Sequence, residues 1–182
     1  VVHAIRLVLT EAEIGGWRGR YPDDLFPIPV TDHIALTLQL SEGWNQISFN
    51  LRPGAAEPRS VFGPILSELD SVRGPSGTFM PSLPDAANAL KAIELGMGYW
   101  VKMNAACTLS STGLCARLET DTVAVSAGWN HIGYLPEHAG DIRDVLAEAL
   151  ASGKIKRITG RDGSFDPNYP DQFNTLTTMT PG

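Results

Sequence analysis

The sequence predicts an α+β protein dominated by antiparallel strands, in which two tandem copies of a small module follow an extra N-terminal strand. Three observations lead to this prediction. The 182 residues include 18 glycines and 13 prolines but only 19% charged residues, a composition typical of turn-rich β proteins. The phrase SEGWNQISFN at residues 41–50 recurs as SAGWNHIGYL at residues 126–135. Apolar residues alternate over short stretches, as they do in strands that bury one face.

Further anchors extend the repeat beyond this phrase. Trp129-Asn130 follows Trp44-Asn45 by 85 positions, and GSFDP follows GTFMP by 86. The segment NTLTTMTPG follows NALKAIELG by 86 positions as well. Because nearly one offset holds at three anchors, we infer a duplicated structural unit. We predict an N-terminal strand and proline-rich loop in residues 1–35, a first copy in residues 36–118, and a second copy in residues 119–182 that lacks its last strand.

Each copy is predicted to begin with an alternating strand that leads through a glycine turn into a second strand. A short amphipathic helix follows. In the second copy the helix begins at Asp141, a favourable N-cap, and ends at Gly153; in the first copy Gly63 and Pro64 interrupt it. Another strand and a turn then lead into a strand that contains a phenylalanine. The predicted strands include residues 36–40, 44–49, 70–74 and 96–103 in the first copy, and 123–125, 129–134 and 154–160 in the second.

Apolar residues at matching positions are the candidate core of each copy, since a repeated aromatic at the start of a strand is usually a packing residue. We expect the copies to superpose with these residues mostly buried: Trp44 on Trp129, Phe79 on Phe165 and Leu90 on Leu176. The asparagine after each tryptophan is expected to hydrogen-bond nearby backbone. Exposed rings would instead indicate stacking on sugars, for which the candidates are Trp44, Tyr99, Trp100 and Trp129.

The two cysteines, Cys107 and Cys115, flank a Ser-Thr-Gly cluster in CTLSSTGLC. This pattern is typical of a strand, a tight turn and a returning strand. We therefore expect a hairpin closed by a disulfide between them, which would indicate an oxidising compartment. The alternative is a pair of reduced, buried thiols.

The charge and hydropathy of the chain exclude two classes of partner. The formal net charge is −6 and no run of Lys or Arg offsets it, so we expect no nucleic-acid partner. No apolar stretch approaches the roughly 20 residues that span a bilayer, so we expect no membrane insertion.

No constellation of residues points to catalysis. His131 has Gln46 as its counterpart in the other copy, which argues against a catalytic histidine. The chain contains no GxSxG or HExxH motif, and no pair of carboxylates stands out as an acid and a base. We therefore predict that the protein is not an enzyme, with no catalytic residues and no cofactor beyond a candidate calcium ion.

Two acidic loops are candidates for calcium, which binds clustered oxygen ligands on turns. The first contains Asp23, Asp24 and Asp32. The second is the better candidate, with Asp162, Asp166, Asn168 and Asp171. Neither matches the EF-hand pattern, and the same residues are also ordinary turn formers.

Several phrases, taken in order, resemble tandem modules of large secreted and cell-surface proteins of bacteria and archaea: GWNQISF, ALKAIELGMGYWVKM, CTLSSTG, AGWNHIGY and NTLTTMTPG. Those modules carry a GWNLIS or GWNLIGY phrase, later a PGxGYW phrase, and then a threonine-rich apolar strand. The resemblance covers residues 36–182. It implies an extracellular, usually non-catalytic module of adhesins, surface layers or appendages of secreted enzymes.

Residues 1–10, VVHAIRLVLT, belong to neither copy and alternate like a buried strand. We expect this strand to complete the sheet of the second copy, either within the chain or in a neighbouring subunit, where repetition would build a filament. The alternative is that the ends of the sequence reflect trimming. The predicted function is that of a non-enzymatic structural module of the cell surface, whose partners are copies of itself or neighbouring domains. The alternative is a carbohydrate-binding accessory module of a secreted hydrolase or adhesin, with polysaccharide as its partner.

Overall fold

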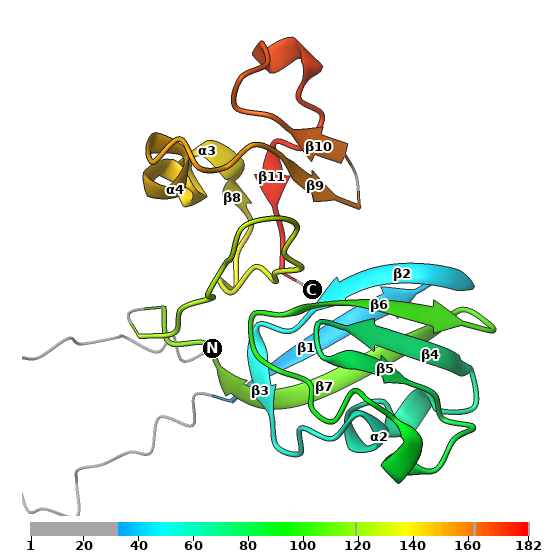
Figure 1. Ribbon diagram of the computed structural model, residues 1–182. Helices are drawn as coiled ribbons and strands as arrows, with labels where there is room; N and C mark the ends of the chain where they lie inside the picture. Colours follow the sequence, from blue (N-terminus) through cyan, green and yellow to red (C-terminus); the bar gives the residue numbers. More distant parts are fainter. Residues whose placement is uncertain (1–32, 119, 162, 182) are drawn as a thin grey trace, which may run out of the picture. The chain divides into compact units, whose positions relative to one another are not determined.

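The structure is a computed structural model that describes residues 33–118, 120–161 and 163–181 (Figure 1). All of these residues belong to one compact unit. It is β-dominated, with several small antiparallel sheets and only short helices, as the sequence predicts for an α+β protein. Residues 1–10 and the acidic residues Asp23, Asp24 and Asp32 lie outside the described residues.

The first repeat contains two antiparallel sheets. One has the strand order β1-β7-β3 and the other β2-β6-β4-β5 (Figure 1). Apart from β4 and β5, which a short turn joins, the strands that pair are separated by long connections, so residues distant in sequence meet in each sheet. The seven strands are β1 (His33–Leu40), β2 (Gly43–Ser48), β3 (Leu51–Pro53), β4 (Leu69–Gly74), β5 (Gly77–Phe79), β6 (Gly98–Met103) and β7 (Cys107–Cys115).

Period-two alternation builds the core of this repeat. In β1 the side chains of Leu36, Leu38 and Leu40 are buried while the residues between them are exposed, because successive strand residues face opposite sides of a sheet. Buried residues from both sheets and from the short helical segments form a single hydrophobic cluster. Phe49 lies in it, with its ring edge-on to Phe62 at 6.3 Å and to Tyr99 at 6.1 Å between centroids.

The helices are shorter than the sequence predicts. In the first repeat α2 (Pro58–Val61) gives way to the 3-10 turn η2 (Gly63–Ile65), as expected where glycine and proline interrupt the pattern. In the second repeat the predicted helix is divided at Leu146 into α3 (Ile142–Val145) and α4 (Ala147–Ala151). Asp141 caps α3 as predicted, because its carboxylate accepts a hydrogen bond from the Arg143 backbone N–H at 2.8 Å.

The second repeat forms only two-stranded sheets among the described residues. β8 (Gly140–Asp141) pairs with β11 (Thr178–Met179), and β9 (Ile158–Gly160) pairs with β10 (Gly163–Phe165). The predicted strand at 123–125 is not formed. In the segment 129–134, only Ile132 makes a β-bridge, with Met97. In the first repeat β2 is held along its length by β6, whereas among the described residues the segment 129–134 has only the bridge to Met97, too little pairing to form a strand.

Local contacts nevertheless recur at the spacing of the sequence repeat. The Asn88 carboxamide accepts a hydrogen bond from the Met80 N–H at 2.7 Å, and Asn174 accepts one from the Asp166 N–H at 2.8 Å. The Thr78 carbonyl accepts the N–H groups of residues 89 and 90, just as the Ser164 carbonyl accepts those of residues 175 and 176. The structure thus repeats these turns without repeating the four-stranded sheet.

The predicted cysteine hairpin is wrong. Residues 107–115 form the single strand β7, whose register with β1 runs without a break from Cys107 opposite Leu40 to Leu114 opposite His33. The two cysteines lie at opposite ends of this strand and are not bonded to each other. Gly113 is required by close packing rather than by a turn, because a Cβ there would lie 1.9 Å from the Arg52 carbonyl oxygen.

Candidate carbohydrate-binding face

One side of the four-stranded sheet carries large aromatic and charged side chains instead of apolar core residues. In β2, Asn45 and Ile47 are buried toward the core, so the alternate residues Trp44 and Gln46 point away from it. The cross-strand register places Trp44 opposite Lys102 and Gln46 opposite Trp100. We call this side the outer face; it consists of Trp44, Gln46, Arg73, Trp100 and Lys102.

The expectation that Trp44 and Trp129 are core residues is wrong. Trp44 is 44% exposed and Trp129 is 76% exposed. Trp44 faces outward because the strand's other side already supplies the core, and Trp129 lies in a segment that forms no strand. Of the other predicted repeat-core residues, Phe79, Phe165 and Leu90 are buried and Leu176 is half-buried.

Arg73 connects the two tryptophan-bearing strands across the outer face. It lies on β4 opposite Trp100 of β6 in the register. Its guanidinium carbon nevertheless sits 4.6 Å from the ring centroid of Trp44 on β2, one strand further along the sheet. The side chain therefore crosses β6, and its cation lies over the indole. This contact places a hydrogen-bond donor beside an aromatic ring.

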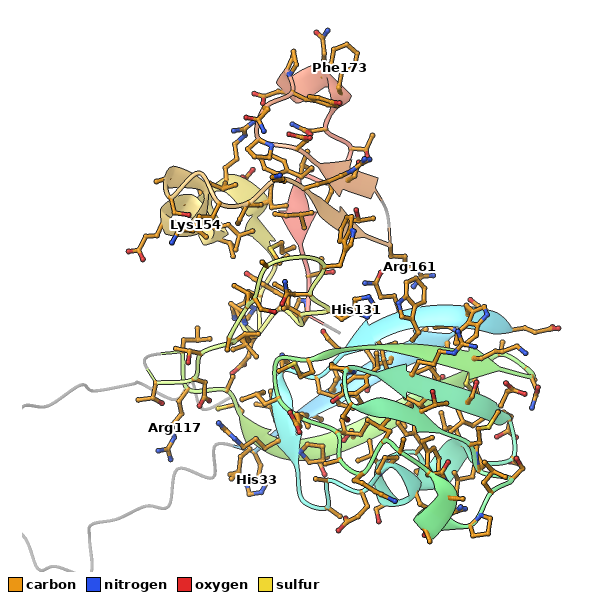
Figure 2. The ribbon with its side chains drawn as sticks, viewed as in Figure 1. His33, Arg117, His131, Lys154, Arg161 and Phe173 are labelled. Atoms are coloured by element: carbon orange, nitrogen blue, oxygen red, sulfur yellow. The ribbon has the colours of Figure 1, made fainter. Side chains whose placement is uncertain are left out.

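A histidine from the second repeat adjoins the same face (Figure 2). The His131 ring lies 6.4 Å from that of Trp100 between centroids, with an angle of 63° between the planes. The backbone holds it there: the Gly98 N–H donates to the His131 carbonyl at 3.1 Å, and the Gly133 N–H donates to the Gly96 carbonyl at 2.8 Å. His131 thus lies beside Trp100 of the outer face.

The outer face has the chemistry of a saccharide platform. A pyranose ring presents C–H groups on its faces, which pack on aromatic rings, and hydroxyls at its edge, which accept and donate hydrogen bonds. Trp44 and Trp100 supply rings, while Arg73, Gln46 and Lys102 supply donors. The Lys102 ammonium also lies 3.5 Å from the Asp70 carboxylate, which keeps an acceptor nearby.

Tyr99 is not part of this surface, although it directly precedes Trp100 in the sequence and was predicted with it as a candidate for stacking on sugars. It is 1% exposed and faces the core, and its hydroxyl accepts a hydrogen bond from the Glu94 N–H at 2.7 Å. Burial raises the pKa of Tyr99. As an alternate residue on β6 it faces the opposite side of the sheet from Trp100, so stacking of a ligand on it is excluded.

The candidate calcium ligands are engaged in local contacts. Asp166 accepts hydrogen bonds from the backbone and side-chain nitrogens of Asn168 at 2.9 and 3.3 Å, an ordinary turn arrangement. Asp171 forms an ion pair with Arg143. Asp162 lies outside the described residues. Within the described ranges, no group of three acidic, histidine or cysteine side chains converges on one point.

Sequence reasoning identified the two tryptophans but not the residues that accompany them. Arg73, Gln46 and Lys102 carry no motif, and only the register of three strands brings them together. The signal available in the sequence was the alternation in GWNQIS, which places Asn45 and Ile47 on one side and Trp44 and Gln46 on the other.

The chain matches no protein-family model, no curated protein and no solved structure. Its resemblance to modules of surface proteins therefore depends on the quoted motifs alone. In the part of the chain that the structure describes, no helix has the length and apolar character needed to cross a bilayer.

Proposed function

We propose that the protein is a non-enzymatic, extracellular module that binds polysaccharide on its outer face. One observation carries the proposal: Trp44 and Trp100 are 44% and 36% exposed on the same side of one sheet, with the Arg73 guanidinium over the Trp44 ring. Large aromatic rings held at a surface beside hydrogen-bond donors are the usual components of a site for a sugar chain. The extracellular location rests on the resemblance, since no disulfide joins the two cysteines.

Substitution of the outer-face tryptophans tests this proposal. Trp44→Ala and Trp100→Ala should each weaken retention of the full chain by insoluble polysaccharides, such as cellulose, chitin and peptidoglycan, by about five- to thirtyfold, since each removes a ring worth roughly 1–2 kcal/mol. Trp129→Ala is the matched control: this tryptophan is 76% exposed and was also predicted as a stacking candidate, but it lies outside the four-stranded sheet that carries the proposed site. Failure of the unmodified chain to bind any polysaccharide, or equal losses in all three variants, would contradict the proposal.

Self-assembly is the second candidate function, and exposed apolar residues in the second repeat favour it. Val125, Trp129 and Ile132 are 66%, 76% and 41% exposed. Among the described residues β9 pairs only with β10, and sheet edges of this kind accept an added strand. The alternating segment VVHAIRLVLT would be the donor, either within the chain or to a neighbouring copy, where it would extend a cell-surface filament.

Deletion of residues 1–10 tests the strand donation. If the segment pairs with a neighbour, the truncated chain should lose polymers in electron micrographs; if it pairs within the chain, the urea midpoint should fall. Substituting Ile5 and Leu7 by aspartate in the full chain should reproduce either effect, because charges cannot enter an apolar sheet face. The proposal would be wrong if the truncated chain kept both its stability in urea and its state of assembly, as measured by light scattering.

A further inference from the structure

A hollow of about 400 Å³ lies in the second repeat beside β10. Phe173, the last residue of the 3-10 turn η4 (Asp171–Phe173), is one of the lining residues and is labelled in Figure 2. Its lining includes Arg157, Ser164, Asp166, Tyr169, Phe173 and Asn174. None of these residues belongs to the outer face.

The first repeat provides an internal comparison for this hollow, because the same backbone scaffold occurs there. Asn88 and Asn174 each bind the backbone of the residue eight positions earlier, accepting from its N–H and donating to its carbonyl. The turn η3 (Asp85–Ala87) corresponds to η4 in the chain. Side chains at matching positions can therefore be compared directly.

The lining differs between the repeats at four positions that would contact a ligand. Where the first repeat has Ser71, Met80, Leu83 and Ala87, the second has Arg157, Asp166, Tyr169 and Phe173. The scaffold forms with small and aliphatic residues in the first repeat, so it does not require charges or rings. Tyr169 and Phe173 are 59% and 62% exposed, which means that packing does not account for them either.

Hydrogen bonds hold both charged groups at the hollow. The Arg157 guanidinium donates to the Ser164 hydroxyl at 3.1 Å. The Asp166 carboxylate receives its two bonds from Asn168 on the Oδ1 atom. The site therefore offers a cationic donor and an anionic acceptor next to two aromatic rings.

We propose that this hollow is a separate binding site for a neutral sugar ring. Opposite charges at one site disfavour a ligand of either net charge, whereas vicinal hydroxyls can accept from Arg157 and donate to Asp166 at once. Tyr169 and Phe173 provide faces for the C–H side of the ring. The site is independent of the outer face, and the two proposals can fail separately.

Titration of the ¹⁵N-labelled full chain with glucose, galactose, mannose and N-acetylglucosamine tests the site by NMR. At least one sugar should shift the amide signals of Ser164, Asp166 and Phe173 in a saturable manner. Tyr169→Leu and Phe173→Ala, which install the residues of the first repeat, should each weaken binding tenfold or more while the spectrum stays dispersed. Trp129→Ala should leave the affinity unchanged.

Two results would overturn the proposal. One is the absence of saturable shifts at these amides with all four sugars. The other is unchanged affinity in the Tyr169→Leu, Phe173→Ala double variant. Shifts confined to amides of β2, β4 and β6 would support the outer face and count against this second site.

Discussion

The asparagine that follows each Gly-Trp pair fastens the turn before it. The Asn45 carboxamide accepts from the Ser41 N–H at 2.9 Å and donates to the carbonyls of Ser41 and Gly43 at 2.7 and 3.1 Å. Asn130 makes the same three contacts with Ser126 and Gly128. This confirms the expectation that these asparagines bond local backbone, and it requires no ligand.

The two asparagines should differ in their effect on stability, because their burial differs. Asn45 is 8% exposed and its bonds are partly buried, so Asn45→Ala leaves partly buried backbone groups without their partner and should cost about 1–3 kcal/mol. Asn130 makes its bonds in an exposed turn where water can replace them, so Asn130→Ala should cost under about 1 kcal/mol. Urea unfolding measures both. Equal losses would show that burial does not control the contribution of this turn.

At the scale of elements, an arginine ties each helix to the phenylalanine strand of its repeat. The Arg59 guanidinium lies 5.4 Å from the Phe79 ring centroid and donates to Asp85 at 2.7 Å. In the second repeat Arg143 lies 5.0 Å from the Phe165 centroid and pairs with Asp171. Sequence comparison misses this clamp because the spacing between arginine and aspartate is 26 in one repeat and 28 in the other.

Another ion pair joins β3 to the segment that follows β7. The Arg52 guanidinium contacts the Asp121 carboxylate at 2.5 Å, and Asp121 also accepts from the Arg117 N–H at 2.7 Å. The hydrogen bond from Arg52, followed by that from Arg117, holds the pKa of Asp121 below its usual range. The carboxylate therefore favours the folded state only while it is ionised.

This arrangement predicts a loss of stability in acid. Because the folded-state pKa of Asp121 is lowered, its contribution is present above the unfolded value of about 3.9 and disappears as the pH falls through the folded value. In urea titrations from about pH 6 to about pH 2, Asp121→Asn should reduce the change of midpoint with pH. Salt should weaken the effect, since the Arg52 side chain is 46% exposed. An identical pH profile in the variant would refute this assignment.

At the scale of the whole molecule, burial is distributed unevenly along the chain. The hydrophobic cluster of the described residues extends from Leu36 to Leu109 and lies wholly within the first repeat. Beyond it the buried apolar side chains are Tyr134, Ile142 and Phe165. Stability should follow this distribution, because burial of apolar area is the main favourable term in folding.

Hydrogen exchange should therefore distinguish the two repeats. Amides of β6 and β7 should exchange through global unfolding, and those of β9 and β10 through local opening at lower free energy. Phe49→Ala should lower the protection of the first repeat by about 3–5 kcal/mol, as loss of a fully buried aromatic does. Phe165→Ala should affect the second repeat alone. Uniform protection across both repeats would instead show that they unfold as one unit.

The strands of the first repeat could be predicted because each carries a local pattern. Alternation located β1, β2 and β6 to within a few residues. The same pattern in the second repeat overpredicted strands at 123–125 and 129–134, because a strand also depends on a neighbour that local sequence does not specify. In the candidate site, Trp44 and Trp100 could be predicted from the sequence, whereas Arg73 was identified only from the pairing of β4 with β6 in the structure.

By itself, the sequence determined the recurring turns, since the side chains of Asn45 and Asn130 bond backbone only a few positions away. Tertiary structure alone decided which way each strand faces and how far it extends. Both faces of the GWNQIS strand carry apolar atoms. Which face is buried depends on the pairing of this strand with β6 and on the core against which the sheet packs. Likewise CTLSSTGLC suits either a hairpin or one long strand, and pairing with β1 along its length makes it one strand. The physical reason is that backbone hydrogen bonds in a sheet are satisfied by distant residues.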